Sequence, residues 1–167
     1  IAFAAGTSIG INSILSRKLG EGDKRSATLV ATNGIVLGFL TSLVFALAGG
    51  LSAHKIFGFF TKDAVIIDMA AQYMWICTVF SLGSFMQIVA EKLLISTGKT
   101  LFSMSSQILG AVVNIILDPI FIFGIGVPQM GIAGAAIATV IGQWCAMIFA
   151  FILNATKNKE ISISFKG

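Results

Sequence analysis

Long apolar stretches separated by short polar segments run through the whole chain. No charged residue occurs within residues 1–16, 26–53, 69–90, 100–117 and 119–156. A helix needs about 20 mostly apolar residues to cross the hydrocarbon core of a bilayer. Because four of the five uncharged stretches reach about this length, the pattern predicts an all-α, polytopic membrane protein built as a helical bundle.

Five membrane-spanning helices follow from these stretches and from the turn residues between them. The first is cut short at its start and ends near Ser16, and the others cover about 27–51, 68–95, 101–123 and 131–154. Glycines mark the short connections at 19–23, 96–99 and 124–128. Residues 52–67 mix phenylalanines with His54 and Lys55, which favours a segment lying in the membrane interface.

Composition and charge support the same class. Only 11% of the residues are charged and 56% are hydrophobic, and the mean hydropathy is +0.96. A soluble domain carries about 25% charged residues. The net charge of +4 does not indicate a nucleic-acid partner, because the basic residues lie between the apolar stretches and form no stripe on one face.

Basic residues are distributed unevenly between the two sides of the predicted topology. The first connection, the third connection and the tail hold nine of them: Arg17, Lys18, Lys24, Arg25, Lys92, Lys99, Lys157, Lys159 and Lys166. The other side holds only Lys55 and Lys62. Since cytoplasmic loops are enriched in lysine and arginine, we expect residue 1 on the outer side and the C-terminal tail in the cytoplasm.

The start of the chain and its few reactive residues exclude other classes. The chain begins at Ile1 within apolar sequence and lacks the layout of a signal peptide, so we interpret it as an internal piece of a longer protein. Cys77 and Cys145 fall inside predicted spans, where small buried hydrophobic residues are expected. Because HExxH, GxSxG and paired-aspartate patterns are missing, we expect neither an enzyme nor a cofactor.

Polar residues inside a predicted span are the best candidates for function, because they are costly to keep in a bilayer. In the span 101–123 they recur every three or four residues, at Ser103, Gln107, Gly110, Asn114 and Asp118. This spacing places them on one face of a helix. Asp118 is the only charged residue within 100–156, so we expect it to face a cavity or a partner.

The residues around Asp118 suggest what it binds. Pro119 follows directly and cannot donate a hydrogen bond to the carbonyl of Ile115, which frees that oxygen. A carboxylate, the Asn114 amide one turn earlier and a free carbonyl are hard oxygen ligands that suit a small cation or a proton. We therefore predict a cation site at Asp118 and Asn114, with sodium as the candidate metal ion. The alternative is that a neighbouring polar group caps Asp118, which then only fixes helix packing.

The span 131–154 is built for close contact between helix backbones. Small residues lie four apart in the pairs Gly131 and Ala135, Gly134 and Ala138, and Ala138 and Gly142. Thr139 lies about 12 Å and Asp118 about 9 Å from the outer ends of their spans, so the two can share one site. Gln107 and Gln143 are candidates for the lining of its cavity. Alternatively, the Thr139 hydroxyl bonds only the backbone of its own helix.

Glu91 is a second acidic residue inside a span, seven residues before Gly98. Because Gln87 lies one turn earlier on the same helix, a polar channel lining formed by Gln87 and Glu91 is one interpretation. The interpretation we favour is an interfacial pair of Glu91 and Lys92 whose charged ends reach toward the headgroups. Trp144 is interpreted as a packing residue.

Four blocks of the chain resemble the multidrug and toxic compound extrusion (MATE) transporters, most of all their MepA-like bacterial branch. The blocks are Ser16-Arg-Lys-Leu-Gly-Glu-Gly-Asp23, Ser96-Thr-Gly-Lys-Thr100, Asn114-Ile-Ile-Leu-Asp118-Pro-Ile-Phe-Ile-Phe-Gly124 and Gly131-Ile-Ala-Gly-Ala-Ala-Ile-Ala-Thr139-Val-Ile-Gly-Gln143. Each block alone is weakly specific, but their order and spacing along the whole chain are similar to those of the family.

This resemblance implies a twelve-helix transporter with two six-helix lobes around a central cavity. Residues 1–167 are then helices two to six of the N-terminal lobe, without the first helix and the second lobe. The family site for the coupling cation maps onto Asn114 and Asp118, with Thr139 on the sixth helix, while another acidic member lies on the absent first helix.

The resemblance also implies a function in the bacterial cytoplasmic membrane. We expect export of cationic or amphipathic drugs by alternating access in exchange for sodium ions or protons. The expected partners are small-molecule drugs and the lipid bilayer, without nucleic acid, and the full-length protein is expected to be a monomer. Two other functions remain open. A lipid-linked-sugar flippase of the same superfamily would carry more basic residues along its cavity, and a passive channel or structural membrane subunit would need no coupled ion.

Overall fold

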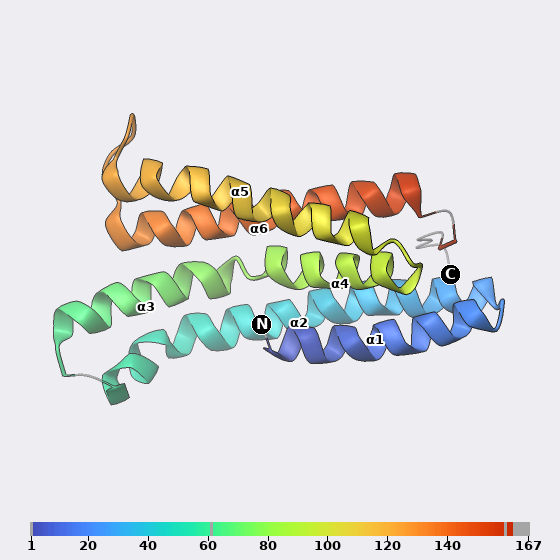
Figure 1. Ribbon diagram of the computed structural model, residues 1–167. Coiled ribbons are helices and arrows are strands. Elements are labelled where there is room, and N and C mark those ends of the chain that lie inside the picture. Colours follow the sequence, from blue (N-terminus) through green and yellow to red (C-terminus); the bar gives the residue numbers. More distant parts are fainter. Residues whose placement is uncertain (1, 61, 159, 162–167) are drawn as a thin grey trace.

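The computed structural model describes residues 2–60, 62–158 and 160–161 of the chain. Within these residues six α-helices and no strands occur, and the helices lie roughly along one common direction (Figure 1). They are α1 (Ala2–Gly20), α2 (Lys24–Phe60), α3 (Ala64–Val79), α4 (Leu82–Ser96), α5 (Thr100–Phe123) and α6 (Gly131–Lys157). The predicted all-α helical bundle is therefore confirmed.

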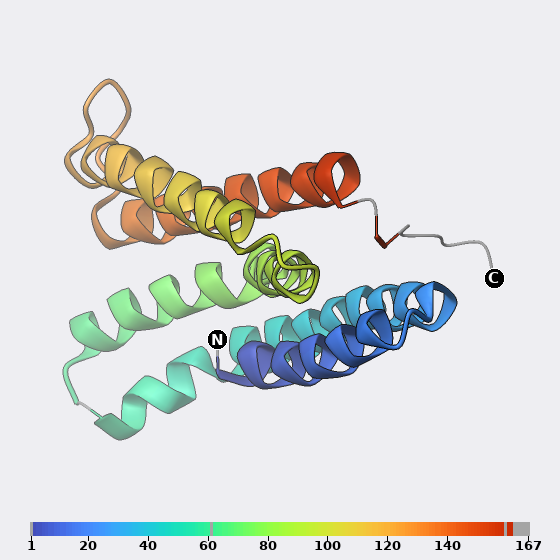
Figure 2. The same cartoon turned by 45° about the vertical axis from the view of Figure 1, so that its right-hand side comes forward.

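Helix α4 lies in the middle of the bundle. It packs against α1 and α2 on one side and against α5 and α6 on the other (Figures 1 and 2). The main apolar cluster lies on the first side and includes Leu15 of α1, Ala27 and Ala31 of α2, and Val89 and Leu93 of α4. The second side, between α4, α5 and α6, holds most of the polar contacts between helices.

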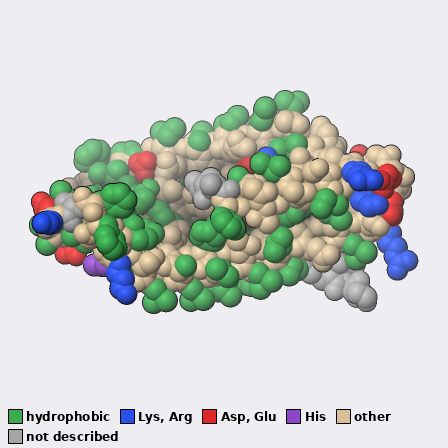
Figure 3. All heavy atoms as spheres, turned by 90° about the horizontal axis from the view of Figure 1, so that it is seen from below, with side chains coloured by type: hydrophobic (Ala, Val, Ile, Leu, Met, Phe, Trp, Pro, Cys, Tyr) green, Lys and Arg blue, Asp and Glu red, His purple; other side chains and the backbone are tan. Residues whose placement is uncertain are grey.

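The outer surface of the bundle is apolar along its length. Large hydrophobic side chains are widely exposed, for example Leu51 at 83%, Leu101 at 81% and Ile115 at 69%. Hydrophobic side chains spread over the face seen in Figure 3, whereas most charged side chains gather toward the two ends. Soluble monomers rarely expose apolar patches of this extent, so the surface is one that suits lipid.

Three helices, α2, α5 and α6, are each long and apolar enough to cross a membrane. Helices α3 and α4 together pass the same test as one span bent by 48°. Helix α1, the predicted first span, is helical but does not pass. Its serines and glycines, Asn12, and Arg17 and Lys18 in its last turn lower its hydropathy.

The connections alternate between the two ends of the bundle. The turns between α1 and α2 and between α4 and α5 lie at the same end as the C-terminal end of α6, and the connections between α2 and α3 and between α5 and α6 lie at the opposite end (Figure 1). The short break between α3 and α4 lies between the two ends (Figure 1). The count of basic residues assumed the same grouping, with the first connection, the third connection and the tail on one side of the membrane. Which end faces the cytoplasm stays a prediction.

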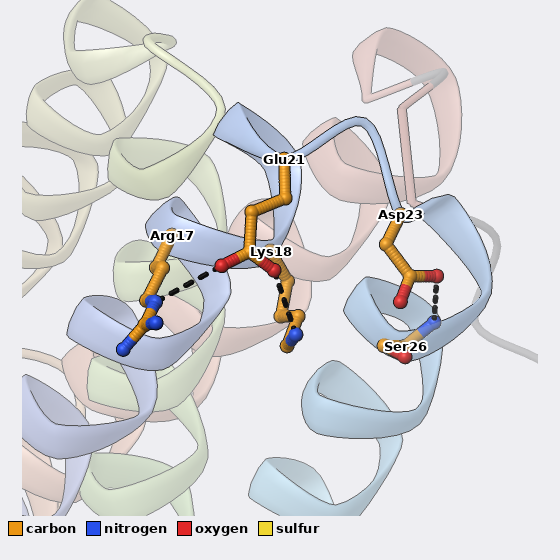
Figure 4. A network of polar contacts seen from close by, with 5 residues as sticks. All are labelled: Arg17, Lys18, Glu21, Asp23 and Ser26. Carbon is orange, nitrogen blue, oxygen red and sulfur yellow. Dashed lines mark hydrogen bonds and ion pairs between the residues drawn. The ribbon is translucent and has the colours of Figure 1, made fainter.

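The turn between α1 and α2 is held by ion pairs and by a helix cap (Figure 4). Glu21 accepts hydrogen bonds from Lys18 at 2.7 Å and from Arg17 at 3.0 Å, and these two bonds lower the pKa of its carboxyl group. Asp23 accepts a bond from the Ser26 amide at 3.0 Å in the first turn of α2, and hydrogen bonding by Ser26 lowers the pKa of this carboxyl group too.

The predicted third span, 68–95, is not one continuous helix. It divides into α3 and α4, which meet at Phe80 and Ser81. Trp144 of α6 packs against Gly83, where an added Cβ would lie 2.6 Å from its ring, and its Nε1 donates to the Phe80 carbonyl oxygen at 3.4 Å. The indole therefore supplies a donor at the break from a distant part of the sequence, and Trp144 is a packing residue as expected.

Residues 52–67 are largely helical, although an interfacial segment outside the spans was expected. Helix α2 continues through Phe60, so the predicted end of this span near residue 51 is too early. Helix α3 begins after Asp63, whose carboxylate accepts hydrogen bonds from two backbone amides of its first turn. Phe59 and Phe60 are 91% and 82% exposed at the end of α2. Their position in a membrane interface stays a prediction.

Candidate functional site

Helices α5 and α6 approach each other closely where small residues meet. A Cβ added to Gly142 would lie 2.8 Å from the carbonyl oxygen of Gly110, and one added to Gly134 would lie 2.6 Å from that of Phe121. Ala138, one turn from each of these α6 glycines, is fully buried. The predicted backbone contact of this span is therefore present, and it brings polar residues of α5 next to those of α6.

Asn114, Asp118 and Thr139 form one polar cluster across the α5–α6 contact. The Asn114 amide nitrogen lies 3.4 Å from Oδ1 of Asp118 and 3.4 Å from Oγ1 of Thr139. The Thr139 hydroxyl also donates to the carbonyl oxygen of Ala135 at 2.9 Å. In this orientation of Asn114 the hydroxyl bonds its own helix and also accepts from Asn114. Cation binding by this cluster stays a prediction.

The Asn114 amide fits its surroundings better with its oxygen and nitrogen exchanged. In that orientation the nitrogen donates to Oδ2 of Asp118 at 3.3 Å, and the oxygen accepts from the Thr139 backbone amide at 3.2 Å. In both orientations the nitrogen faces Asp118. Asn114 therefore acts as a donor to the carboxylate, and its oxygen must turn before both groups can face the same metal ion.

A cavity of about 310 Å³ lies between α4, α5 and α6. Its polar lining residues are Ser84, Gln87, Gln107, Asn114, Thr139 and Gln143. The structure therefore places Gln107 and Gln143 on the cavity wall, where the sequence predicts them. Asp118 is not among the lining residues and lies one turn beyond Asn114, on the helix that forms the wall.

A second cavity of about 290 Å³ adjoins the first and shares Ser84, Thr139 and Gln143 with it. Its wall is more aromatic and includes Phe45, Tyr73 and Phe85, and the free thiol of Cys77 also lines it. The ring centroids of Phe45 and Phe85 are 5.4 Å apart. The two cavities together offer a polar wall and an aromatic wall to a bound molecule.

The sequence suggested that Glu91 and Lys92 form an interfacial pair. The structure shows instead that Glu91 is buried between helices. Its side chain is only 6% exposed, and among the described residues it forms no ion pair with a lysine or arginine. Instead its Oε1 accepts from Gln87 and its Oε2 from Gln107, both at 2.9 Å. The Ser106 hydroxyl oxygen lies 3.3 Å from Oε1 and has a shorter bond, of 2.7 Å, to the Ser103 carbonyl oxygen. Counting residues along α4 missed these partners because Ser106 and Gln107 lie on α5.

The neighbourhood of Asp118 contains few other groups that bind metals. In the described parts of the chain, no three histidine, cysteine or acidic side chains come together. Helix α5 also runs through Pro119 without interruption and ends at Gly124, whose φ of +76° suits glycine. A sodium ion here would therefore depend on a single carboxylate with neutral oxygens, in an unbroken helix.

Known transporters are similar to the chain along nearly all of its length. An FAD transporter from Shewanella oneidensis is 28% identical over 161 residues, which are 96% of the chain and 36% of that protein. A probable multidrug resistance protein NorM from Bacillus cereus is 28% identical over 90% of the chain and 34% of its own length. The multidrug export protein MepA from Staphylococcus haemolyticus is 26% identical over 99% of the chain and 36% of its own length. The chain therefore spans about a third of these relatives.

Solved structures of a MATE family transporter match the fold. The inward-facing form of a multidrug resistance transporter gives a TM-score of 0.91 at 25% identity, over 99% of the chain and 37% of that structure. The outward-facing form gives the same TM-score and identity over 99% of the chain and 36% of that structure. The sequence model of the MatE family matches residues 1–120. On this match, together with the bundle and its α5–α6 contact, the chain belongs to the MatE family of membrane transporters.

Proposed function

We propose that this chain is part of a secondary active transporter that exports cationic or amphipathic compounds in exchange for sodium ions or protons. The observation that carries the proposal is the cluster of Asn114, Asp118 and Thr139 beside the 310 Å³ cavity. None of the described residues that line the two cavities is basic, which favours a cationic over an anionic cargo. The aromatic wall of the second cavity suits the apolar part of an amphipathic molecule.

Asp118 is the residue we assign to the coupling ion. A proton or sodium ion that binds there neutralises the carboxylate, so the Asn114 amide no longer needs to donate to it. Asn114 contacts Thr139 and also lines the cavity, so a turn of its amide alters the α5–α6 contact and the surface offered to the cargo together. Ion binding also removes a negative charge that attracts a cationic cargo, which makes ion and cargo compete.

The two coupling ions make different demands on the cluster. A proton can bind a carboxylate oxygen that no hydrogen bond occupies while Asn114 still donates to the other. A sodium ion prefers oxygen ligands and requires the Asn114 oxygen to turn toward Asp118. Both remain within the proposal, and an imposed gradient of each ion distinguishes them.

Alternating access gains support from the likeness to two conformations. The described bundle matches inward-facing and outward-facing transporter structures equally well, with a TM-score of 0.91 for each. A bundle that keeps its shape in both states moves as a body between them. A ligand drives such a movement only if it binds the two states with different affinity, and Asp118 supplies the difference for the ion.

The rival functions differ from this proposal in charge or in coupling. One relative is named an FAD transporter, and FAD carries phosphates, which a cavity without basic lining residues does not favour. The same argument applies to a flippase for lipid-linked sugars. A passive channel or a structural subunit needs neither a lone acid beside the cavity nor ion exchange.

The proposed site of action is the bacterial cytoplasmic membrane, with residue 1 outside and the C-terminal tail inside. Cysteines introduced as Lys62→Cys and Lys24→Cys in the full-length protein test this orientation. An impermeant thiol reagent added outside whole cells should label position 62 and not position 24. Labelling of position 24 alone would invert the topology.

The transport proposal is tested with the full-length protein in everted membrane vesicles. Ethidium should accumulate in the vesicles when a proton or sodium gradient is imposed, and an ionophore that collapses the effective gradient should stop it. Accumulation that ignores both gradients would indicate a passive channel. An absence of any ethidium movement above empty vesicles would contradict export of cations.

A further inference from the structure

The cluster around Glu91 has no part in the coupling site described above. It lies between α4 and α5. Its α5 member, Gln107, is roughly 16 Å from Asp118 along the helix axis, at about 1.5 Å per residue. Two neutral donors reach the Glu91 carboxylate, the amide nitrogens of Gln87 and Gln107, while the Ser106 hydroxyl oxygen lies 3.3 Å from it and has a shorter bond to the Ser103 carbonyl oxygen. A carboxylate accepts hydrogen bonds only, so this arrangement matches its ionised form.

These bonds determine which end of each glutamine faces the cavity. Gln87 and Gln107 line the cavity, whereas Glu91 does not. Because each Nε2 donates one N–H to a carboxylate oxygen at 2.9 Å, each glutamine keeps its carbonyl oxygen and one further N–H for other partners, and the carbonyl oxygens are the acceptors left for the cavity. In the described part of the chain neither carbonyl oxygen accepts a hydrogen bond from protein. The inner wall of the cavity therefore presents two acceptors.

The opposite wall is different. Gln143 of α6 accepts a hydrogen bond from Ser84 through its Oε1, so its amide nitrogen is the atom left for the cavity. Acceptors are thus concentrated on the α4–α5 wall, in front of the Glu91 charge. Glu91 lacks an ion pair with any described lysine or arginine, so its negative charge acts on the cavity without a fixed counter-charge. Such a field is strong where water is scarce.

We propose that Gln87 and Gln107, oriented by Glu91, form a binding site for the N–H groups of an organic cation, such as an ammonium or amidinium group. The inference rests on the proposed function, because it assumes that the cavity holds a cationic cargo. It goes further by naming the group that is recognised. The two carbonyl oxygens accept its N–H donors, and the carboxylate behind them stabilises its charge. Glu91 is a positioning residue in this site, since it acts through the two glutamines.

The variant Glu91→Gln separates this role from simple helix packing. A glutamine at position 91 offers an NH₂ group where the carboxylate offered only acceptors. Gln87 or Gln107 must then turn its carbonyl oxygen toward residue 91, which leaves an NH₂ group facing the cavity. The size and burial of the side chain stay the same, but the wall loses at least one acceptor and the negative charge.

Two matched dyes serve as probes for the purified full-length protein. Rhodamine 123 and tetramethylrhodamine methyl ester are both fluorescent monocations with the same ring system, but only the first carries N–H groups. Fluorescence anisotropy gives the Kd of each. The parent should bind rhodamine 123 about tenfold more tightly than its methylated counterpart, as one hydrogen bond to a charged group would provide. In Glu91→Gln this ratio should fall toward one.

Controls keep the loss of the ratio from being confused with misfolding or with loss of charge. Glu21→Gln is the matched control: it removes an exposed carboxylate in the turn between α1 and α2 and should leave the ratio of the two Kd values unchanged, because Glu21 lines neither cavity. Gln107→Met removes one carbonyl oxygen at an exposed position and one donor to Glu91 but keeps the carboxylate, and it should lower the ratio in part. Retained binding of the methylated dye shows that each variant is folded.

The outcomes separate the two proposals. If the parent binds both dyes and Glu91→Gln and Gln107→Met leave the ratio as in the parent, the glutamine site is wrong while cargo binding stands. If both variants lower the ratio but ethidium export does not depend on an ion gradient, the site stands and the coupled-transport proposal fails. If the parent binds neither dye, both are overturned.

Discussion

Glu91 of α4 and Asp118 of α5 are acidic residues inside helices, and the structure holds them in different ways. Glu91 is 6% exposed and accepts hydrogen bonds of 2.9 Å from two amide groups. Asp118 is half-buried, and the Asn114 amide that faces it lies at 3.3 or 3.4 Å depending on its orientation. Short bonds from several donors fix a carboxylate, whereas one long bond leaves it free to exchange partners. The comparison suggests an orienting role for Glu91 and an exchange role for Asp118.

The largest expected effect on stability comes from the α5–α6 contact, which positions Asp118 and not Glu91. Gly142→Leu places a large side chain where even a Cβ would lie 2.8 Å from the Gly110 carbonyl oxygen, so α5 and α6 must separate. We expect overpacking to destabilise the protein by about 3 kcal/mol or more. Thermal unfolding of the purified full-length protein measures it. The exposed Ile148→Leu is the matched control on the same helix and should melt like the parent.

The next effect contrasts the two acids directly. Glu91→Ala removes the acceptor of Gln87 and Gln107 and empties the space of a buried side chain, so it should cost about 1 to 3 kcal/mol. Asp118→Ala removes one long hydrogen bond and should cost less than about 1 kcal/mol. Melting temperatures of the two variants give the comparison. A larger drop for Asp118→Ala would reverse the assignment of the fixed and the exchangeable carboxylate.

A smaller effect is expected from Thr139→Val, which keeps the shape of the side chain and removes its hydroxyl. Where the Asn114 nitrogen faces the Thr139 hydroxyl, Asn114 then loses one of its two contacts and its amide is held less firmly next to Asp118. In the exchanged orientation its contact is the Thr139 backbone amide, which the variant keeps, so the variant also distinguishes the two orientations. We expect an ion dependence of transport weakened about threefold to tenfold, as for a hydrogen bond of about 1 kcal/mol, while stability changes little. An unchanged ion dependence would remove the Thr139 hydroxyl from the coupling cluster.

The smallest effect concerns carboxylates outside the membrane-spanning part. Hydrogen bonding by Ser26 lowers the pKa of Asp23 below its ordinary value of 3.8. The stability that this cap contributes is therefore present above that value and is lost as the pH falls through the lower pKa of the folded state. Asp23→Ala should melt slightly below the parent at neutral pH. The difference should vanish in strong acid, and a difference that persists there would contradict the cap.

Local sequence patterns predicted the fold well where a helix is determined by its own residues. The predicted spans 101–123 and 131–154 agree closely with α5 and α6, because glycines and charged residues bound them. No proline marks the break between α3 and α4 in the sequence. At the break, Trp144 of α6 packs against Gly83 and donates a hydrogen bond to the Phe80 carbonyl oxygen. Such a tertiary contact is invisible to a local pattern.

The candidate site shows the same limit. Asn114 and Asp118 were paired correctly by their spacing on one helix, and Thr139 was added by its depth in the next. Glu91 was placed at the interface because depth along α4 was the only measure the sequence offered. Its burial comes from donors on α5, and a search for serine and glutamine at matching depth on the neighbouring span would have found Ser106 and Gln107.

The most direct test of the exchange role of Asp118 is cargo transport by Asp118→Asn in the full-length protein. Asparagine keeps the shape and hydrogen bonding of the side chain but removes its charge. In everted vesicles with an imposed proton or sodium gradient, the variant should be inserted and folded like the parent yet show no gradient-driven accumulation of ethidium. If Asp118→Asn accumulates ethidium with the parent's response to either gradient, Asp118 does not carry the coupling ion.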